Sequence, residues 1–169
     1  MIEYYNSFSN KYDGFYDKIQ FQKYEAVNIK QLRINEWTID HGGGTGLLSK
    51  WLKYPLITFD ISDQMLRVGK LENKELQCIV GDMNKLPFRS ASIKQILSFT
   101  ALQNSSDPFI ALSEIWRTSE NNGIHLITLL EKKYNETIFS NQLSKTPITY
   151  KISKLSIEDI LLTIIVKKT

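Results

Sequence analysis

The feature that most constrains the fold is a glycine-rich turn directly after a short apolar segment. The sequence TID at positions 38–40 leads into HGGGTG at 41–46, and a helix-like stretch follows. Glycine lets the backbone turn tightly and lets a ligand approach without a Cβ in the way, and a helix that begins there offers free N–H groups. A strand, a glycine turn and a helix in this order indicate a site for a nucleotide-like cofactor.

The spacing of these glycines does not match the dinucleotide-binding pattern. That pattern needs glycine at the first, third and sixth positions of GxGxxG. Counted from Gly42, the sixth position is Leu47, and counted from Gly44 it is Ser49. An NAD-dependent oxidoreductase is therefore disfavoured. A turn without any ligand is disfavoured too, because four glycines in five residues are costly to order.

Apolar segments alternate with helix-like segments from residue 36 onward, which favours βαβ units and a mostly parallel sheet. The predicted helices between the strands follow Gly46 (47–53), Ser62 and Pro108, with Ser62 and Asp107 as caps. In the last of these helices, the apolar residues recur at helical spacing and form one stripe. The strands are predicted at Trp37–Asp40, Leu56–Asp60, Leu76–Val80, Ile93–Phe99 and Gly123–Leu130.

The two ends of the chain depart from this alternation. Thr149–Leu155 and Ile160–Lys167 are too close for a helical crossover, so we expect them to pair antiparallel. At the other end, a helix is predicted over Phe15–Leu32 after an irregular arm. Many aromatic residues lie in the first 24 positions; most should pack on the sheet, and one or two could cover a ligand site.

Length and composition fit a single domain over residues 1–169, with residues 1–32 as an arm and helix that could form a lid. The chain has 169 residues, 42% hydrophobic and 23% charged, and a net charge of +3. The longest apolar stretch near the C-terminus is far below the ~20 residues of a membrane span, and the first residues do not resemble a secretory signal. Cys78 is the only cysteine. These features predict a cytoplasmic protein without a membrane segment.

The segment from Asp40 to Gly46 resembles the first motif of the class I S-adenosylmethionine (SAM)-dependent methyltransferases, in particular the type 11 methyltransferase domains. The family motif is D-x-G-x-G-x-G after a strand, and every fixed position is matched. The resemblance implies a Rossmann-like α/β fold: a mostly parallel seven-stranded sheet, an antiparallel last strand and helices on both faces. It also implies SAM as cofactor, bound by Asp40, Gly42, Gly43, Gly44 and Gly46.

Two further segments resemble the next motifs of the family. The acid at the end of the second strand, Asp60, with Ile61 beside it, would hold the ribose hydroxyls. Asp82 in the Gly81–Phe88 segment would accept the adenine amino group, and Met83 would pack on the ring. Each acid could instead be an ordinary turn or helix-cap residue. Three motifs in the family's order are much stronger evidence than one.

The remaining site predictions also rest on this resemblance. Phe99 follows the fourth strand, where the family places residues near the methyl group, and an N-terminal tyrosine, Tyr12, would cover the methionine end of the cofactor. Tyr16, Gln103 and Asn104 would face the methyl acceptor, although the two amides could be ordinary loop residues. No catalytic residue is assigned.

Other chemistry has little support. His125 lies inside an apolar strand and should be a packed, hydrogen-bonded histidine, and Cys78 reads as a small core residue. With His41 as the only other histidine, no zinc site or catalytic triad can be assembled, and no metal is expected. The chain departs from the family in lacking the usual proline before Gly123 and in carrying Lys94 at the start of the fourth strand.

The predicted function is transfer of a methyl group from SAM to an unidentified acceptor, either a small molecule or an RNA or translation component. The N-terminal segment faintly resembles archaeal methyltransferases that need a small zinc-protein partner, so a small activating protein is a possible partner. Residues 130–169 hold seven lysines against four acidic residues, which is the whole charge excess. The alternative is a non-catalytic SAM-binding protein or a subunit of a methyltransferase complex.

Overall fold

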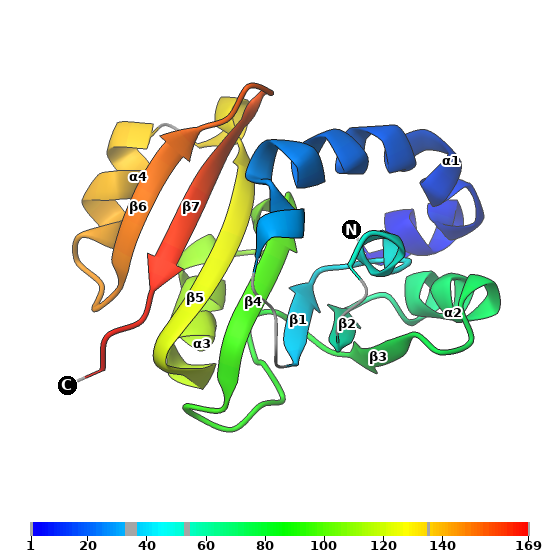
Figure 1. Ribbon diagram of the computed structural model, residues 1–169, viewed down its shortest axis with the longest axis horizontal. Helices are drawn as coiled ribbons and strands as arrows, with labels where there is room; N and C mark the ends of the chain where they lie inside the picture. The colour runs from blue at the N-terminus through cyan, green and yellow to red at the C-terminus, as the bar shows by residue number, and fades with distance from the viewer. Residues whose placement is uncertain (1, 33–36, 53–54, 135, 169) are drawn as a thin grey trace.

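A computed structural model of the chain describes residues 2–32, 37–52, 55–134 and 136–168. Its centre is a seven-stranded sheet with the order β3-β2-β1-β4-β5-β7-β6 (Figure 1). The strands are β1 (Thr38–His41), β2 (Leu56–Asp60), β3 (Gln77–Val80), β4 (Ile93–Phe99), β5 (Ser119–Leu130), β6 (Thr149–Lys154) and β7 (Asp159–Ile165).

The strand directions confirm the predicted sheet. β1 pairs in parallel with β2 and β4, and the parallel set extends to β3 on one side and β5 on the other. The last strand, β7, is antiparallel to both β5 and β6. The chain moves outward from β1 to β3 and then returns to β4 on the other side of β1, so the strand order reverses between β1 and β4. Open α/β sheets bind ligands at such a reversal, outside the carboxyl ends of the strands.

Helices lie on both faces of the sheet, with α1 on one face and α3 and α4 on the other (Figure 1). The helices are α1 (Ile2–Val27), α2 (Asp63–Glu72), α3 (Pro108–Thr118) and α4 (Glu136–Leu143). Both predicted caps are confirmed: the Ser62 hydroxyl accepts from the Met65 amide, and the Asp107 carboxylate accepts from the Phe109 amide. No helix of the described ranges is long and apolar enough to cross a membrane.

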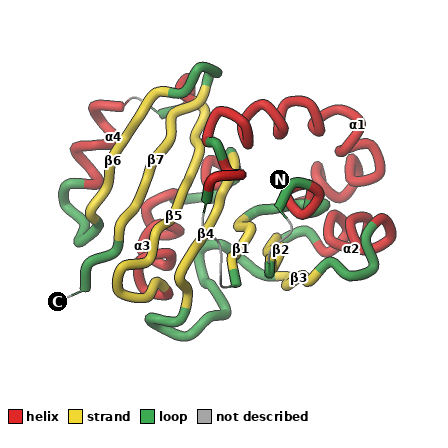
Figure 2. The backbone as a smooth tube through the Cα atoms, viewed as in Figure 1, coloured by secondary structure: helices red, strands yellow, loops and turns green. Residues whose placement is uncertain are grey.

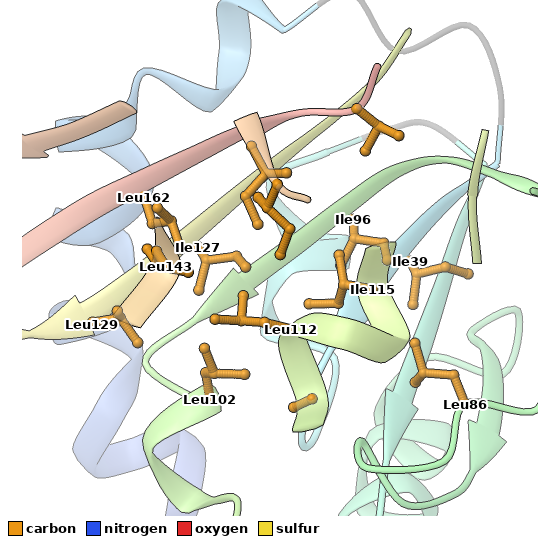
Figure 3. Packing of buried hydrophobic residues seen from close by; sticks show 14 of the residues in the cluster. Ile39, Leu86, Ile96, Leu102, Leu112, Ile115, Ile127, Leu129, Leu143 and Leu162 are labelled. Carbon is orange, nitrogen blue, oxygen red and sulfur yellow. The ribbon is translucent and has the colours of Figure 1, made fainter. Parts of the chain in front are cut away.

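The larger core lies between the sheet and the pair α3 and α4. Leu112 and Ile115 of α3 are fully buried and point toward Ile96 of β4 and Ile127 of β5 (Figure 3). The predicted apolar stripe of α3 is therefore its core face. Burying a leucine or isoleucine side chain contributes about 1.5–3 kcal/mol, so this face holds α3 on the sheet.

A smaller core lies under the second half of α1, on the opposite face of the sheet. Tyr24 packs edge-on against Phe99 of β4, with ring centroids 4.7 Å apart, and Phe21 stacks on Trp51 at 4.3 Å. Leu97 of β4 is fully buried in the same cluster. The prediction that most N-terminal aromatic residues pack on the sheet is confirmed for these rings.

The N-terminal prediction was wrong in its boundaries. The helix begins at Ile2 rather than Phe15, so the expected irregular arm is helical, and Asn28 ends it with a positive φ of 57°. Figure 2 shows α1 crossing the face of the sheet near the upper ends of the central strands. The first half of α1 contacts distant residues of the folded chain, and such contacts override weak local propensity.

The segment after the glycine turn is also shorter than the predicted helix over 47–53. It forms only a 3-10 turn, Leu47–Lys50, and Trp51 follows it. Lys53 lies outside the described residues. Only nine residues separate Gly46 from the start of β2, which leaves too little chain for a full crossover helix.

His125 is a packed, hydrogen-bonded histidine, as expected. Its Nδ1 accepts from the Ile96 amide at 3.0 Å, and its Nε2 lies 2.6 Å from the Ser119 hydroxyl, which donates to the Ile115 carbonyl. Nε2 therefore carries the proton. Burial lowers the pKa of His125 to about 3, so the ring is neutral at physiological pH. The ring fills a polar gap where the β4–β5 register shifts between Ile93 and Gln95.

Replacing His125 with leucine should lower the free energy of unfolding by about 2–4 kcal/mol, because the buried Ile96 amide loses its acceptor. Urea unfolding followed by circular dichroism measures the change. Ile124→Ala, at an exposed neighbouring position, is the control, and a loss equal to that of the control would contradict the structural role of the ring.

Candidate cofactor-binding site

The glycine turn after β1 has the conformation that the sequence suggested. Gly42, Gly44 and Gly46 have positive φ values of 73°, 57° and 76°. A Cβ on Gly42 would overlap the Cβ of Ala101, and a Cβ on Gly44 would lie 2.9 Å from Met65 Cε. Positive φ favours glycine, and these close approaches exclude a larger side chain. The turn brings backbone rather than side chains to the carboxyl end of β1.

The Asp60 carboxylate joins the end of β2 to this turn. Its Oδ2 accepts from the Gly44 amide at 2.9 Å, and its Oδ1 accepts from the Ser62 amide at 2.8 Å. Burial raises its pKa, while the backbone donors oppose the rise. Each carboxylate oxygen has two acceptor positions, so Asp60 keeps spare acceptor capacity beside its backbone donors. Ile61, beside it, is 40% exposed at the rim of the turn.

Asp40 lies beneath the turn, buried and without a partner for one oxygen. A Cβ on Gly43 would overlap Asp40 Oδ2, so the carboxyl group packs directly against the turn. Asp40 is only 3% exposed, and its Oδ2 makes no hydrogen bond. Burial, reinforced by the charge of Asp60, raises the pKa of Asp40 to about 8. A buried carboxyl group of this kind gains from a donor or a positive charge.

His41 also belongs to this turn, and it is fully buried. Its ring stacks on Phe59, and its Nδ1 lies 3.2 Å from the Ser98 hydroxyl, which donates to the His41 carbonyl. Nδ1 therefore carries the proton and donates to that hydroxyl, and burial lowers the His41 pKa to about 4. The side chain is a neutral packing group, consistent with a variable position of the motif.

The Asp82 loop is held in place by α3. The Glu114 carboxylate accepts from the Leu86 amide at 2.8 Å, and Arg117 donates to the carbonyls of Leu86 and Phe88 at 3.0 Å. Asp82 itself is exposed and accepts from the Asn84 amide through Oδ1. Met83 points toward the glycine turn, with its Cε 3.8 Å from where a Gly42 Cβ would be.

The residues after β4 have different environments. Phe99 is 8% exposed and packs against Tyr24 in the smaller core. Gln103 accepts from the Leu130 amide at 3.3 Å, and Asn104 donates to the Tyr5 hydroxyl at 3.0 Å. Of these three side chains, Asn104 is the one that the structure joins to the first half of α1.

The first half of α1 covers the turn. Tyr12 lies with its Cε1 4.0 Å from the position of a Gly44 Cβ, and Tyr16 stacks on Tyr12 at 4.7 Å. Burial raises the pKa of Tyr12, so its hydroxyl stays protonated. Asn6 accepts from the Ser62 hydroxyl at 2.6 Å. The structure therefore brings Tyr12 to the glycine turn, where the sequence analysis expected it.

A buried ion pair at the edge of the site had no signal in the sequence. Lys23 Nζ lies 3.1 Å from Asp159 Oδ2 and donates to the Thr100 hydroxyl at 2.6 Å, and both charged side chains are under 10% exposed. Thr100 has a φ of 52°, which is strained for a β-branched residue. Burial lowers the pKa of Lys23, and the Asp159 charge opposes that. Strained backbone of this kind is found preferentially at functional sites.

Sequence reasoning also missed the contacts of Asp13, Glu114 and Arg117. Glu114 and Arg117 are spaced three apart on a helix, a spacing that predicts an ion pair, but nothing local shows that the pair holds a loop. Asp13 accepts from Thr45 of the glycine turn at 2.5 Å, and the two residues are 32 positions apart. Within the described residues, no group of three or more potential metal ligands is present.

A glycine turn after β1, acids at the ends of β1 and β2, and this strand order define the Rossmann-like fold of class I methyltransferases. Residues 39–127 match the family described as methyltransferase domain, and the chain belongs to that family.

Individual known proteins are similar to this chain. An uncharacterized protein of Methanocaldococcus jannaschii is 28% identical over 128 residues, which cover 75% of this chain and 50% of that protein. The malonyl-[acyl-carrier protein] O-methyltransferase of Hamiltonella defensa is 24% identical over 131 residues, 74% of this chain and 51% of that enzyme. The chain thus spans about half the length of these curated relatives.

A solved structure shares the fold over nearly the whole chain. It is a chain from the complex between the Haloferax volcanii Trm112 methyltransferase activator and the putative methyltransferase. The TM-score is 0.83 at 14% identity, with 97% of this chain and 98% of that chain covered. At this identity, the comparison establishes the fold.

The unpartnered Asp40 leads to a pH prediction. Its folded-state pKa of about 8 lies above the ordinary value of 3.8, so the folded state binds the proton more tightly. The resulting stabilisation is complete below pH 3.8 and is lost as pH rises through 8. Between pH 5 and 8, the ligand-free protein should lose stability relative to Asp40→Asn, on the order of 1 kcal/mol per pH unit. Thermal unfolding of both proteins across this range measures the difference, and parallel curves would contradict it.

Proposed function

We propose that the chain is a SAM-dependent methyltransferase whose cofactor lies across the carboxyl ends of β1 and β2. The observation that carries this proposal is the pair of buried carboxyl groups at the glycine turn. Burial raises the pKa of both Asp40 and Asp60, the charge of Asp60 adds to the rise at Asp40, and neither takes part in an ion pair among the described residues. A cationic ligand with sugar hydroxyls would compensate both groups.

The residues of the site fit such a ligand. The turn from Gly42 to Gly46 presents bare backbone where side chains cannot fit, which suits a close approach by the amino-acid part of the cofactor. The spare acceptor capacity of Asp60 suits the ribose hydroxyls. Asp82 is exposed with one oxygen uncommitted to the Asn84 amide, and Met83 lies beside the turn, which suits an adenine between them.

The bound cofactor supplies an electrophilic methyl group and leaves as a neutral thioether, so positioning rather than strong acid-base catalysis should supply most of the rate. The chain contributes the features that positioning requires. Tyr12 covers the turn and limits the access of water, while Asn104 and Tyr5 offer neutral hydrogen-bonding groups beside it. We propose that these groups orient the cofactor and the methyl acceptor, and we assign no general base.

The substrate-facing role of Asn104 is supported by its hydrogen bond to Tyr5 in the first half of α1, and that of Tyr16 by its stacking on Tyr12. Gln103 has less support, because its carbonyl oxygen is used by the Leu130 amide. Phe99 has less support as a direct cofactor contact, because it packs beneath Tyr24. We propose that Phe99 acts by supporting the end of β4 and that the acceptor approaches from the side of Asn104.

The second candidate is a non-catalytic SAM-binding protein or a methyltransferase-complex subunit. It is favoured by the packing of α1, since Tyr12 already occupies the space above Gly44. The two candidates predict the same cofactor binding and differ only in turnover. An acceptor assay with radiolabelled SAM, run on small-molecule and RNA fractions, distinguishes them.

A small activating protein is part of the proposal. Its support is the similar fold of the chain from the complex with the Trm112 activator. We further propose a cytoplasmic location and a single domain over residues 1–169, on the lone free cysteine and the continuous sheet. Mass spectrometry of the small molecules that copurify with the chain is the first experiment for identifying the methyl acceptor.

Calorimetric titration with SAM and NAD tests the cofactor. SAM or its demethylated product, S-adenosylhomocysteine, should bind at micromolar or lower concentration, and NAD should not. Binding of NAD alone would overturn the proposal. Heat from both ligands would remove the selectivity that the glycine spacing implies.

Asp60→Ala should weaken binding of S-adenosylhomocysteine by about 30- to 800-fold, or 2–4 kcal/mol, because two charge-assisted hydrogen bonds to the ribose are lost. The variant should also unfold at a lower temperature, since the Gly44 and Ser62 amides lose their acceptor. Asp60→Asn keeps the shape of the side chain and one acceptor, so its affinity for S-adenosylhomocysteine should lie between those of the unmodified protein and Asp60→Ala. Titration calorimetry measures all three affinities.

Asp63→Asn is the matched control. Asp63 lies three residues further along, is exposed, and pairs with Arg67 on the surface of α2. The affinity of this variant for S-adenosylhomocysteine should stay within about twofold of that of the unmodified protein, because an exposed ion pair contributes little. Equal affinities for Asp60→Ala and this control, with only the unfolding temperature lowered, would limit Asp60 to a structural role.

A further inference from the structure

The two halves of α1 are attached to the protein in different ways. The second half is anchored by buried contacts: Lys23 pairs with Asp159 of β7, Tyr24 packs on Phe99, and Phe21 stacks on Trp51. Tyr24 and Lys23 are 5% and 7% exposed. Moving this half would separate a buried ion pair and open the smaller core, so it is fixed to the sheet.

The first half of α1 is attached mainly by polar side chains at the surface of the site. Asn6 accepts from Ser62, and the Tyr5 hydroxyl accepts from Asn104. Tyr4 is 57% exposed, and Tyr5 and Tyr12 are only half-buried, so this half has no fully buried aromatic side chain among those described. Segments held in this way open at a small fraction of the global unfolding free energy.

Asp13 makes the most direct contact between this half and the glycine turn. Its Oδ1 accepts from the Thr45 hydroxyl at 2.5 Å, and its Oδ2 accepts from Lys50 Nζ at 3.0 Å. Lys50 Nζ also forms an ion pair with Glu72 Oε2 of α2 at 3.1 Å. One carboxylate thus joins α1 to the turn and to the 3-10 segment after it, and Thr45 is 5% exposed. The contact uses side chains only, so it can break without disturbing the backbone hydrogen bonds of the turn.

Gly14 follows Asp13 directly and lies near the middle of the 26-residue helix. A Cβ there would meet nothing within 4 Å, so no packing requires glycine at this position. Glycine in a helix interior destabilises it by about 0.5–1 kcal/mol relative to alanine. Figure 1 shows α1 bent between its N-terminal turns and the straight part that crosses the sheet. Kinks form preferentially at such residues.

We propose that Asp13 is a positioning residue that latches the first half of α1 over the bound cofactor, with Gly14 as the hinge on which that half opens. The inference rests on the proposed function, because it places the cofactor between the turn and Tyr12. Entry and release require Tyr12 to leave Gly44, and the Asp13–Thr45 contact must break first. The latch therefore sets how long the cofactor stays bound.

Stopped-flow mixing with S-adenosylhomocysteine, followed by protein fluorescence, tests the latch. Asp13→Asn and Thr45→Val should each raise the dissociation rate about 10-fold, the size expected for loss of one charge-assisted hydrogen bond. The double variant should be no faster than the faster single variant, because both changes remove the same contact. The matched control is Asp17→Asn, an exposed acid one helical turn further along α1, which should release the ligand at the unmodified rate.

Gly14→Ala tests the hinge, and its methyl group has room, so the variant should fold normally. Stiffening the helix should slow association and dissociation together by several-fold and leave the dissociation constant unchanged, an outcome that a merely structural role would not produce. Unchanged rates in Asp13→Asn and Thr45→Val would overturn the latch, and unchanged rates in Gly14→Ala would overturn the hinge. If the unmodified protein binds neither SAM nor S-adenosylhomocysteine, the proposed function itself fails, and the two failures are thereby distinguished.

Discussion

The hydrogen bond from the Gly44 amide to the Asp60 carboxylate connects the two strands on which the site is built. It fixes the turn after β1 relative to the end of β2, at 2.9 Å, in a segment whose glycines would otherwise sample many conformations. The second oxygen of Asp60 holds the Ser62 amide, and Ser62 in turn caps α2 and contacts Asn6 of α1. One carboxylate therefore sets the relative positions of the turn, α2 and the first half of α1.

Local patterns in the sequence were sufficient for the sheet and for helices α2 and α3. β2 and β4 have the predicted limits, because short β-branched runs between turn signals have few alternatives. α3 was predictable from its apolar stripe, and its cap from Asp107 before Pro108. Gly42 and Gly44 were recognisable because a run of glycines after a strand indicates a tight turn, whereas Asp60 was singled out through its resemblance to the second motif of the family.

The rest depended on contacts between distant residues. The start of α1 is stabilised by Tyr5 and Asn6, whose partners lie 99 and 56 positions away. The Lys23–Asp159 pair joins the second helix half to the last strand, and nothing near either residue indicates it. Phe99 is a related case: its place at the end of β4 suggested cofactor contact, but whether an aromatic ring at a strand end is covered depends on the tertiary position of Tyr24.

The position of β7 between β5 and β6 has a consequence for how the protein forms. The last strand in chain order is an interior strand of the sheet, paired along its length with β5 on one side and β6 on the other. Until β7 is synthesised, the edge of β5 that pairs with β7 is unpaired, and the buried residues of β5 lack the neighbours that β7 provides. Parallel strands with long-range pairing already form slowly, and unpaired edges invite association with other chains. During translation, the sheet can therefore be completed only when Asp159–Ile165 has left the ribosome.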